Sequence, residues 1–339
     1  MTVIHKDYPL VELHRHLDGN VRLETILDLG RKFNLPLPGN SIEELRPYIQ
    51  VTEAKPSILD FFNKFEWLTG VLVDYNAVHR VAYENVLDAK NEGIDYIELR
   101  FSPWFMAERN HLIPAGVVEA VVDGIQAGVR DTGIKANLIG IISRTYGPEI
   151  CMRELEALLS QKRHIVALDL AGDELHFPGE LFVEHFIIAR DAGWHSCPHA
   201  GEAAGPESVW QALKDLKAER IGHAVHALKD PVLLDHLAEH NIGVESSLTS
   251  NVQTSTVADY ASHPISIFLR NGIAATINTD DPGISGVTIG HEFEVAAVAA
   301  GLTPDEIFQA QRNALAQAFL CDSEKTTLLT AKLHPAPSL

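Results

Sequence analysis

The sequence contains few cysteines and no paired cysteine motif. Only Cys151, Cys197 and Cys321 occur among the 339 residues, and no two of them form a CxxC pair. This odd number of widely spaced cysteines argues against the disulfide framework of small secreted domains and against a structural zinc ribbon. Apolar residues make up 46% of the chain, so the fold can depend on a large hydrophobic core instead.

Basic residues are also scarce. The chain has 27 Lys and Arg against 46 Asp and Glu, a formal net charge of −19, and no run of Lys or Arg. A protein with this charge repels nucleic-acid backbones and anionic membrane surfaces. We therefore expect neither nucleic acid nor a membrane as a partner, whereas a small uncharged ligand is compatible with the charge. The sequence leaves the oligomeric state open.

Long apolar runs and several well-known motifs are missing. No stretch reaches the roughly 18 apolar residues that a membrane-spanning helix needs, and Met1–His16 has no segment of the signal-peptide type. Walker A, GxGxxG and GxSxG motifs are absent, so a nucleotide-hydrolysing or serine-hydrolase function has no support. Without internal repeats or linkers, we expect a cytoplasmic protein with one domain over residues 1–339.

Eight short apolar segments rich in β-branched residues recur along the chain. They are Val11–Leu17, Ile94–Phe101, Ala136–Ser143, Ile165–Ala171, Trp194–Ala200, Arg220–Ala224, Gly243–Leu248 and Ala274–Thr279. Such continuous apolar runs are typical of parallel strands covered by helices. The glycines that open several of them, Gly93, Gly133, Gly193, Gly243 and Gly272, suit left-handed helix C-termini. Eight strands alternating with helices predict an α/β fold of the (β/α)₈ TIM-barrel type.

Two intervals between the predicted strands show helical patterns. Within Val118–Val129, the residues Val118, Val121, Val122, Ile125 and Val129 form one apolar helix face. The interval Asp18–Glu92 is too long for one crossover, and it contains the helical pattern Ser57–Leu72 with Phe61, Phe62, Phe65, Trp67 and Leu68. We predict that residues 18–92 form a helical insertion that acts as a lid over the barrel mouth.

Histidines and carboxylates gather at the ends of the predicted strands. His14 and His16 lie two residues apart and therefore on one face of the first strand. The fifth strand ends in His199, the sixth in His223 and the eighth in Asp280. Barrel enzymes build their active sites at these carboxyl ends of the strands, so the side chains are expected to converge.

This set of side chains fits a metal site with one open position. Three imidazoles and a carboxylate without a thiolate suit Zn²⁺, with iron or cobalt as possible replacements, and we predict one zinc ion held by His14, His16, His199 and Asp280. A metal lowers the pKa of a water that it binds to about 7. Glu202 follows His199 closely and is the expected proton donor, while His223 is expected to orient and deprotonate the water.

Six segments resemble the adenosine deaminase family and keep its order along the chain. They are ELHRHLDG at Glu12–Gly19, YIELRFSP at Tyr96–Pro103, LDLAGDE at Leu168–Glu174, PHAGE at Pro198–Glu202, RIGHA at Arg220–Ala224 and NTDDPG at Asn278–Gly283. The stretch SSLTSN at Ser246–Asn251 resembles the segment of the seventh strand. The resemblance spans nearly the whole chain and implies zinc-dependent conversion of adenosine to inosine and ammonia in purine salvage.

The resemblance also implies roles for individual residues. The zinc ligands of the family fall on His14, His16, His199 and Asp280, and its proton donor to purine N1 falls on Glu202. His223 takes the role of orienting the water. By the same resemblance, Asp281 contacts purine N7, the backbone near Gly172 contacts N3, and Asp18, next to His16, holds the 5′-hydroxyl of the ribose. Because no residue reads the 2′-position, we expect 2′-deoxyadenosine to be accepted.

Four positions near the motifs bear on how well the site is formed. Ala224 stands where the family usually has Gly, which strains the backbone if φ is positive. Pro198 lacks the N–H that an interior strand needs. Ser246–Ser247 replaces a pair that often includes Cys, and Cys197 shares a strand face with His199, where we interpret it as a filler of the core. None of these changes removes a ligand or a catalytic group.

Two alternative functions stay open at the level of sequence. An adenine deaminase or a deaminase of N6-substituted aminopurine nucleotides uses the same chemistry, but Asp18 favours a ribose hydroxyl and repels a 5′-phosphate. A barrel that binds a ligand without catalysis has no need for Glu202 and His223. The HxE and PCxxC signature of the cytidine-deaminase type is absent.

Overall fold

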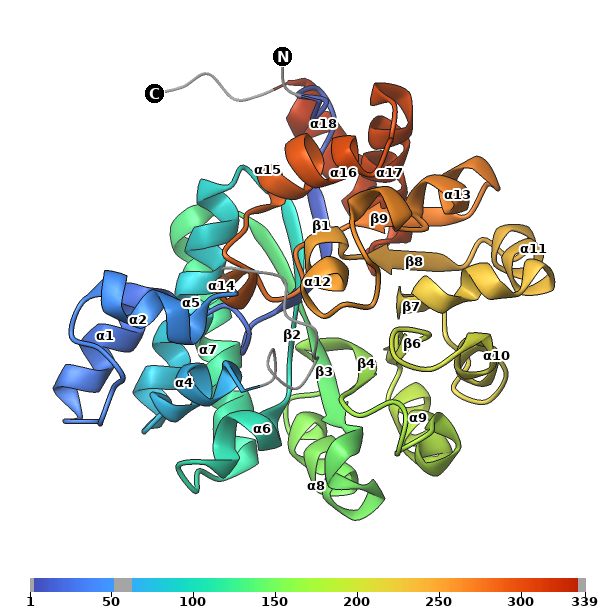
Figure 1. Ribbon diagram of the computed structural model, residues 1–339. Helices are drawn as coiled ribbons and strands as arrows, with labels where there is room; N and C mark the ends of the chain where they lie inside the picture. The colour runs from blue at the N-terminus through green and yellow to red at the C-terminus, as the bar shows by residue number, and fades with distance from the viewer. Residues whose placement is uncertain (1–2, 52–62, 335–339) are drawn as a thin grey trace.

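A ring of parallel strands forms the centre of the molecule, and helices surround it (Figure 1). The computed structural model describes residues 3–51 and 63–334. The strands are β1 (Val11–His16), β2 (Tyr96–Phe101), β3 (Lys135–Ser143), β4 (Ile165–Ala171), β5 (His195–Ser196), β6 (His199–Ala200), β7 (Arg220–His223), β8 (Gly243–Ser246) and β9 (Ala274–Ile277). The predicted α/β barrel is confirmed, and each predicted segment contains a strand.

The ring consists of two hydrogen-bonded sheets that meet at two seams. One sheet has the order β1-β2-β3-β4-β5 and the other β6-β7-β8-β9, and all their pairs are parallel. At one seam, the N–H of His16 donates to the carbonyl of Asp280 at 2.8 Å, and the N–H of Asp280 donates to the carbonyl of His14 at 3.0 Å. These bonds join the first strand to the segment after the last one, and they fix His14, His16 and Asp280 side by side.

The predicted fifth strand, Trp194–Ala200, is divided into β5 and β6. Pro198 lies between the two pieces and has no N–H to donate to a ladder. Its carbonyl still accepts a hydrogen bond from the N–H of Gly222 at 3.0 Å, and the N–H of Cys197 donates to Leu168 at 3.0 Å. The expectation of one continuous strand was therefore wrong, although the chain keeps its place in the barrel wall through these two bonds.

Helices cover the outside of the strands. Those between β2 and β6 are α6 (Pro103–Glu108), α7 (Pro114–Thr132), α8 (Pro148–Leu159) and α9 (Val183–Asp191). Those after β6 are α10 (Pro206–Lys214), α11 (Pro231–Glu239), α12 (Leu248–Gln253), α13 (Ile265–Arg270), α14 (Pro282–Ser285), α15 (Ile289–His291), α16 (Ala297–Ala299), α17 (Pro304–Gln317) and α18 (Asp322–Leu333). The short 3₁₀ helices are η1 (Arg144–Tyr146), η2 (Gly179–Phe182), η3 (Val225–Lys229) and η4 (Tyr260–Ser262), and η5 (Glu292–Ala296) is a π-helix.

The apolar face predicted within Val118–Val129 belongs to α7, where Val118, Val121, Val122 and Ile125 are buried. The predicted glycine positions are confirmed for Gly93, Gly133, Gly193 and Gly272, whose φ values lie between 71° and 89°. Gly243 is different, because Asn241 takes the left-handed conformation there, with φ 52°. A Cβ atom at Gly243 would lie 2.7 Å from the side chain of Arg220, so this glycine permits a close approach rather than a turn.

The long interval after β1 contains α1 (Leu23–Lys32), α2 (Ile42–Ile49), α4 (Phe65–Gly70) and α5 (Tyr75–Asn91). Helix α5 packs against α7, since a Cβ atom at Gly124 would lie 2.8 Å from that of Ala82. The segment after α2 lies against the loop after β9, where the N–H of Val51 donates to Ile284 at 2.8 Å. Phe61 and Phe62 lie outside the described residues. The lid role of residues 18–92 stays a prediction.

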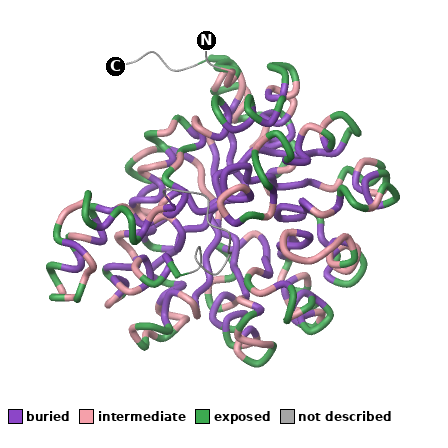
Figure 2. The backbone as a smooth tube through the Cα atoms, in the orientation of Figure 1, coloured by how far each residue is buried: buried purple, intermediate pink, exposed green. Residues whose placement is uncertain are grey.

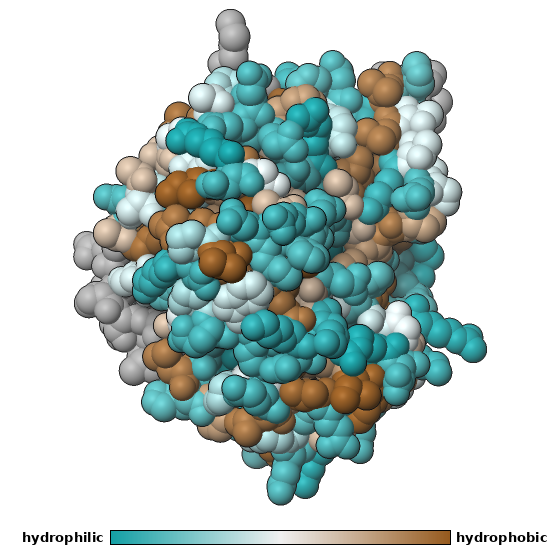
Figure 3. All heavy atoms as spheres, turned by 90° about the vertical axis from the view of Figure 1, so that its right-hand side faces the viewer, coloured by the Kyte–Doolittle hydropathy of each residue, from teal (hydrophilic) through white to brown (hydrophobic). Residues whose placement is uncertain are grey.

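Burial is strongest in the strands and on the inner faces of the helices (Figure 2). The face that carries α9, α10, α11 and α13 is largely hydrophilic and shows apolar residues only in small groups (Figure 3). In the part of the chain that the structure describes, no helix combines the length and the apolar character needed to cross a membrane.

Candidate functional site

Four imidazole rings meet at the carboxyl ends of the strands. His14 and His16 come from β1, His199 begins β6, and His223 ends β7. The ring of His14 lies 4.7 Å from that of His199 and 4.9 Å from that of His223, measured between centroids. The ring of His16 lies 5.3 Å from that of His199. Strand ends that are far apart in the sequence thus bring these four histidines together, as predicted.

Asp280 completes this cluster from the segment after β9. Its Oδ1 lies 3.1 Å from Nε2 of His14 and 3.3 Å from Nε2 of His16, and Nε2 of His16 lies 3.4 Å from Nε2 of His199. Among the described residues, two overlapping groups have ligand atoms close enough to hold a metal ion. One contains His14, His199, His223 and Asp280, and the other contains His16, Asp280 and Asp281. The donors of the predicted set are therefore gathered around Asp280.

Two buried carboxylates determine which nitrogens of this cluster carry lone pairs. Nδ1 of His14 lies 2.8 Å from Glu245, and Nδ1 of His199 lies 2.9 Å from Asp169. A carboxylate only accepts hydrogen bonds, so each Nδ1 carries the hydrogen and each Nε2 presents a lone pair to the site. Nε2 of His14 is buried and has no hydrogen-bond partner among the described residues. At 3.1 Å it faces a carboxylate oxygen, an arrangement that a cation bound to both acceptors would stabilise.

Buried arginines stabilise the charged form of both carboxylates. Arg100 donates to Asp169 at 2.9 Å and to Glu245 at 2.6 Å, and Arg220 donates to Glu245 at 2.6 Å. Burial would raise the pKa of Glu245, but Arg100 and Arg220 outweigh burial and hold it well below its usual range. His199 and Arg100 do the same for the pKa of Asp169. Both groups therefore stay acceptors for His14 and His199 at neutral pH.

The histidines of the cluster differ in basicity. Burial lowers the pKa of His199 to about 3 and also lowers that of His14, so both rings are neutral at physiological pH. Burial works against the charged form of His16 as well. In that case the carboxylates of Asp281 and Asp18 outweigh it and raise the pKa of His16 to about 9. A metal ion at this site must displace a proton from His16.

Glu202 and His223 lie beside the cluster. Oε2 of Glu202 and Oδ2 of Asp280 are each 3.7 Å from Nε2 of His223. Burial raises the pKa of Glu202, which favours its protonated form. The loop that carries Glu202 is held by Glu174, whose carboxylate accepts the N–H groups of Gly201 to Ala204 at 2.5, 3.1, 2.7 and 2.9 Å. The side chain of Glu202 thus lies next to the cluster, and its role as proton donor stays a prediction.

Several residues of the site adopt left-handed backbone conformations. The φ values are 65° for His223, 50° for Ala224 and 65° for Asp280. For side chains other than Gly or Asn, this region costs about 1–2 kcal/mol per residue. The concern raised by Ala224 in place of Gly is therefore confirmed, and its methyl group is fully buried. The left-handed residues His223 and Ala224 change the direction of the chain directly after β7.

A cavity of about 290 Å³ opens beside the cluster. It is lined by His16, Asp18, Phe65, Ser102, Phe105, Ile141, Ser143, Thr145, Tyr146, Ala171 and Gly172. A second cavity of about 70 Å³ shares four of these residues and adds His199, Glu202, His223, Asp280 and Asp281. The two form one binding region, in which Asp18 lines only the larger cavity, Glu202 lines only the smaller one, and Gly172 lines both.

Asp281 and Asp18 are buried at this mouth. A Cβ atom at Gly19 would lie 1.7 Å from Oδ1 of Asp281, so only a glycine allows Asp281 this position. Burial and the neighbouring charge of Asp280 raise the pKa of Asp281 well above its usual range. Oδ2 of Asp18 accepts the N–H of Ser102 at 3.0 Å, which fixes the carboxylate at the edge of the cavity.

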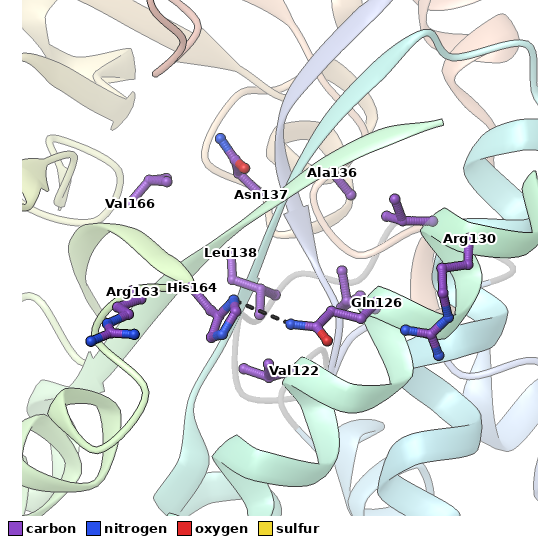
Figure 4. A pocket seen from close by; sticks show the side chains of 11 residues that line it. Val122, Gln126, Arg130, Ala136, Asn137, Leu138, Arg163, His164 and Val166 are labelled. Carbon is purple, nitrogen blue, oxygen red and sulfur yellow. Dashed lines mark hydrogen bonds between the residues drawn. The ribbon is translucent and has the colours of Figure 1, made fainter. Parts of the chain in front are cut away.

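A further cavity of about 320 Å³ lies away from these strand ends (Figure 4). It is formed by α7, the beginning of β3 and the turn before β4, with Gln126 and His164 joined by a hydrogen bond. None of the predicted site residues lines this cavity.

Cys197, Ser246 and Ser247, which were singled out from the sequence, line neither of the two cavities at the cluster. Cys197 packs with Ile139 and Ala167, and burial raises the pKa of its thiol well above the usual value, so it is a filler of the core as interpreted from the sequence. The hydroxyl groups of Ser246 and Ser247 are buried and have no hydrogen-bond partner among the described residues.

Sequence reasoning missed the residues that support the cluster. These are Arg100, Asp169, Glu174, Glu245, Asn251 and His263. Charged residues within apolar strands were a usable signal for Arg100, Asp169 and Glu245, because a buried charge needs a partner. Asn251 and His263 lie outside the strands and offered no comparable signal.

Comparisons with known proteins identify the family of this chain. Residues 9–333 match the model of the family described as adenosine deaminase. An adenosine deaminase of Vibrio cholerae serotype O1 is 59% identical over 327 residues, which cover 96% of this chain and 98% of the relative.

Two solved structures have the same fold. An adenine deaminase from Arthrobacter aurescens superposes with a TM-score of 0.89 at 24% identity, covering 96% of this chain and 98% of the other. An amidohydrolase from Burkholderia ambifaria with bound zinc has a TM-score of 0.86 at 25% identity, covering 96% of this chain and 90% of the other.

Proposed function

We propose that the metal of this protein is one zinc ion held by His14, His16, His199 and Asp280. The premise is that this chain belongs to the adenosine deaminase family and hydrolyses adenosine to inosine and ammonia. The observation that carries this proposal is Nε2 of His14, a buried lone pair 3.1 Å from a carboxylate oxygen with no donor between them. Imidazole and carboxylate donors without a thiolate suit zinc. A zinc ion is also present in the Burkholderia relative.

The chemistry of the site is divided between the metal and the side chains around it. When bound, the ion supplies an acidic water that becomes a nucleophile near neutral pH. His223 orients this water towards C6 of the purine, since its Nε2 lies beside both Asp280 and Glu202. Burial raises the pKa of Glu202 and so favours its protonated form, from which Glu202 delivers a proton to N1 of the base. Protonation at N1 makes C6 more electrophilic and prepares the loss of ammonia.

Asp281 and Gly172 hold the purine ring. Purine N7 is a hydrogen-bond acceptor, so a carboxylate cannot bind it but a carboxylic acid can. The raised pKa of Asp281 favours its protonated form, which can donate a hydrogen bond to N7. The backbone near Gly172 faces the same cavity and contacts N3. These two contacts orient the base between Glu202 and the metal ligands.

Asp18 and His16 select a ribose over a phosphate. Asp18 lines the larger cavity and accepts the 5′-hydroxyl, and His16 lies next to it, with 3.7 Å between Nδ1 and Oδ1 of Asp18. Of the described residues that line this cavity, none is Lys or Arg, so a nucleotide finds no counter-charge there. A nucleoside is therefore favoured over an N6-substituted nucleotide and over free adenine. No lining residue is assigned to the 2′-position, and 2′-deoxyadenosine is accepted.

The cytoplasmic location expected from the sequence stays a prediction.

A panel of substrates tests this proposal directly. The absorbance decrease near the adenosine maximum is followed with adenosine, 2′-deoxyadenosine, adenine and AMP, before and after treatment with a chelator. We expect turnover of both nucleosides, poor turnover of adenine and AMP, loss of activity on chelation, and recovery with one equivalent of zinc. Full activity in a protein shown to be free of metal would contradict the metal site. Equal turnover of adenosine and AMP would contradict the role of Asp18.

A further inference from the structure

Three buried side chains form a hydrogen-bonded chain that ends at His223. Nε2 of His263 lies 3.1 Å from Oδ1 of Asn251, and Nδ2 of Asn251 lies 3.1 Å from Nδ1 of His223. Asn251 belongs to α12, which follows β8, and His263 lies between η4 and α13. All three side chains are at least 98% buried, which excludes water as a competing partner.

The direction of hydrogen donation along this chain starts at the backbone. The N–H of Ile265 donates to Nδ1 of His263 at 3.2 Å, so this nitrogen holds a lone pair. A neutral His263 must then carry its hydrogen on Nε2 and donate it to Oδ1 of Asn251. Burial and the nearby His223 lower the pKa of His263 to about 3, which keeps this ring neutral.

The amide of Asn251 passes this direction on to His223. With its oxygen facing His263, Asn251 turns its N–H₂ group towards Nδ1 of His223, which must accept. We propose that Asn251 and His263 are positioning residues that hold His223 in the tautomer with its hydrogen on Nε2. His223 then donates a hydrogen bond into the site and cannot take a proton through Nε2 while it is neutral.

This tautomer distinguishes His223 from the two histidines beside it. Nδ1 of His14 and Nδ1 of His199 face carboxylates, so their Nε2 atoms present lone pairs to the site. Nδ1 of His223 faces an amide donor instead, so its Nε2 presents a hydrogen to Oδ2 of Asp280 and Oε2 of Glu202, each at 3.7 Å.

The inference rests on the proposed function and narrows it. His223 orients the attacking water as a hydrogen-bond donor, and while neutral it does not remove a proton from this water through Nε2. From the sequence, we expected His223 both to orient and to deprotonate the water. The proposed tautomer keeps the first role and replaces the second.

Nitrogen NMR of histidine-labelled protein measures the tautomer itself. We expect His223, identified by the signals that disappear in His223→Gln, to show an unprotonated Nδ1 and a protonated Nε2 in the metal-free and in the zinc-loaded protein. In Asn251→Asp, a carboxylate of the same size can only accept, so the hydrogen should move to Nδ1. A wild-type His223 that is protonated at Nδ1 and unprotonated at Nε2 would overturn the proposal.

Kinetics of the same variant separate a positioning role from a structural one. We expect Asn251→Asp to lower kcat by about 10²- to 10⁴-fold, the range reached when a catalytic histidine is held in the wrong tautomer, with a smaller change in KM. His263→Phe leaves the amide of Asn251 free to rotate, and we expect kcat to fall by about tenfold. Asn271→Asp is the matched control, because this exposed amide only donates to Ile267 at the end of α13.

Unchanged or increased kcat in Asn251→Asp would overturn the proposal, because a carboxylate behind Nδ1 favours a lone pair at Nε2. If that variant does not fold, the wild-type nitrogen signals and His263→Phe still decide the question. Failure of the proposed metal site would appear separately, as full activity after chelation, and it would leave the tautomer of His223 measurable.

Discussion

The two sides of the barrel wall differ in the length of their strands. β1 to β4 have 6, 6, 9 and 7 residues, whereas β6 to β9 have 2, 4, 4 and 4. The long strands end at the larger cavity, with Asp18 and Gly172 in its lining. The short strands are followed by Glu202, the left-handed turn at His223, and Asp280. The comparison teaches that long regular strands build the wall of a binding cavity, while short strands let the chain turn sharply and aim reactive groups inwards.

Apart from the proposed metal ligands His14 and His16 on β1, substitutions on the side of the short strands should therefore affect chemistry, and substitutions on the side of the long strands should affect binding. The largest effect is expected for Asp280→Ala. Loss of this ligand removes the metal and with it several kcal/mol of transition-state stabilisation, so kcat should fall by more than about 10⁴-fold. Metal analysis of the purified variant checks this, with the exposed Asp235→Ala as control. Stoichiometric zinc in Asp280→Ala would contradict the assignment.

Glu202→Gln tests the short-strand side without touching a ligand. The amide keeps the size of the side chain but has no acidic proton, so we expect zinc to stay bound and kcat to fall by about 10²- to 10⁴-fold. Steady-state kinetics and metal analysis of the same sample measure both properties. Glu239→Gln on the exposed end of α11 provides the control, and a near-normal kcat in Glu202→Gln would remove the proton-donor role.

Asp18→Ala tests the long-strand side. Removal of a charged hydrogen-bond acceptor costs about 1.5–3 kcal/mol, so KM for adenosine should rise by roughly 10- to 100-fold while kcat changes less. Asp18→Asn keeps the acceptor for the N–H of Ser102 and should be affected less. A loss confined to kcat would show that the division between the two sides does not hold.

His16 lies where the two sides meet, and its protonation should control the binding of zinc. Its pKa is raised to about 9, so below that pH the metal-free ring is charged and must lose a proton before it can bind. Affinity for zinc should therefore increase about tenfold per pH unit between pH 7 and about 9 and then level off. Competition with a chromophoric chelator measures this slope. His16→Gln should abolish it, and a pH-independent affinity of the wild-type protein would contradict the charged state of His16.

The smallest effect is expected for Ala224→Gly in the turn after β7. Relief of a left-handed alanine is offset by the flexibility of glycine in the unfolded chain and by the lost methyl group, so unfolding free energy should change by less than about 1 kcal/mol. Thermal unfolding and kcat measure the outcome, and Ala227→Gly in η3, where φ is negative, should be destabilising. A large gain in kcat would show that Ala224 distorts the short-strand side.

The sequence predicted the fold and the members of the cluster because both depend on local patterns. Apolar runs give the strands, and the positions of His14, His199 and Asp280 at strand ends place them at one mouth. The division of the fifth strand was missed, although Pro198 had been noted as a residue without a donor. In that case the loss of one N–H outweighed a continuous apolar pattern.

The supporting residues could not be predicted because their partners are set by the tertiary fold. Asp169 reaches His199 across 30 residues and Glu245 reaches His14 across 231. A buried charge in the sequence indicates that the residue has a partner, but only the order of the strands in the ring identifies that partner. Asn251 and His263 act through the orientation of an amide and a ring, which no residue pattern encodes.

Glu174 has a consequence for the kind of ligand that the mouth admits. Four successive amides, such as those of Gly201 to Ala204, form a backbone concavity that in other proteins attracts phosphate groups. Here a side chain of the same molecule fills that concavity from the start. The carboxylate of Glu174 thus occupies these amides, and the phosphate group of a competing ligand cannot bind to them.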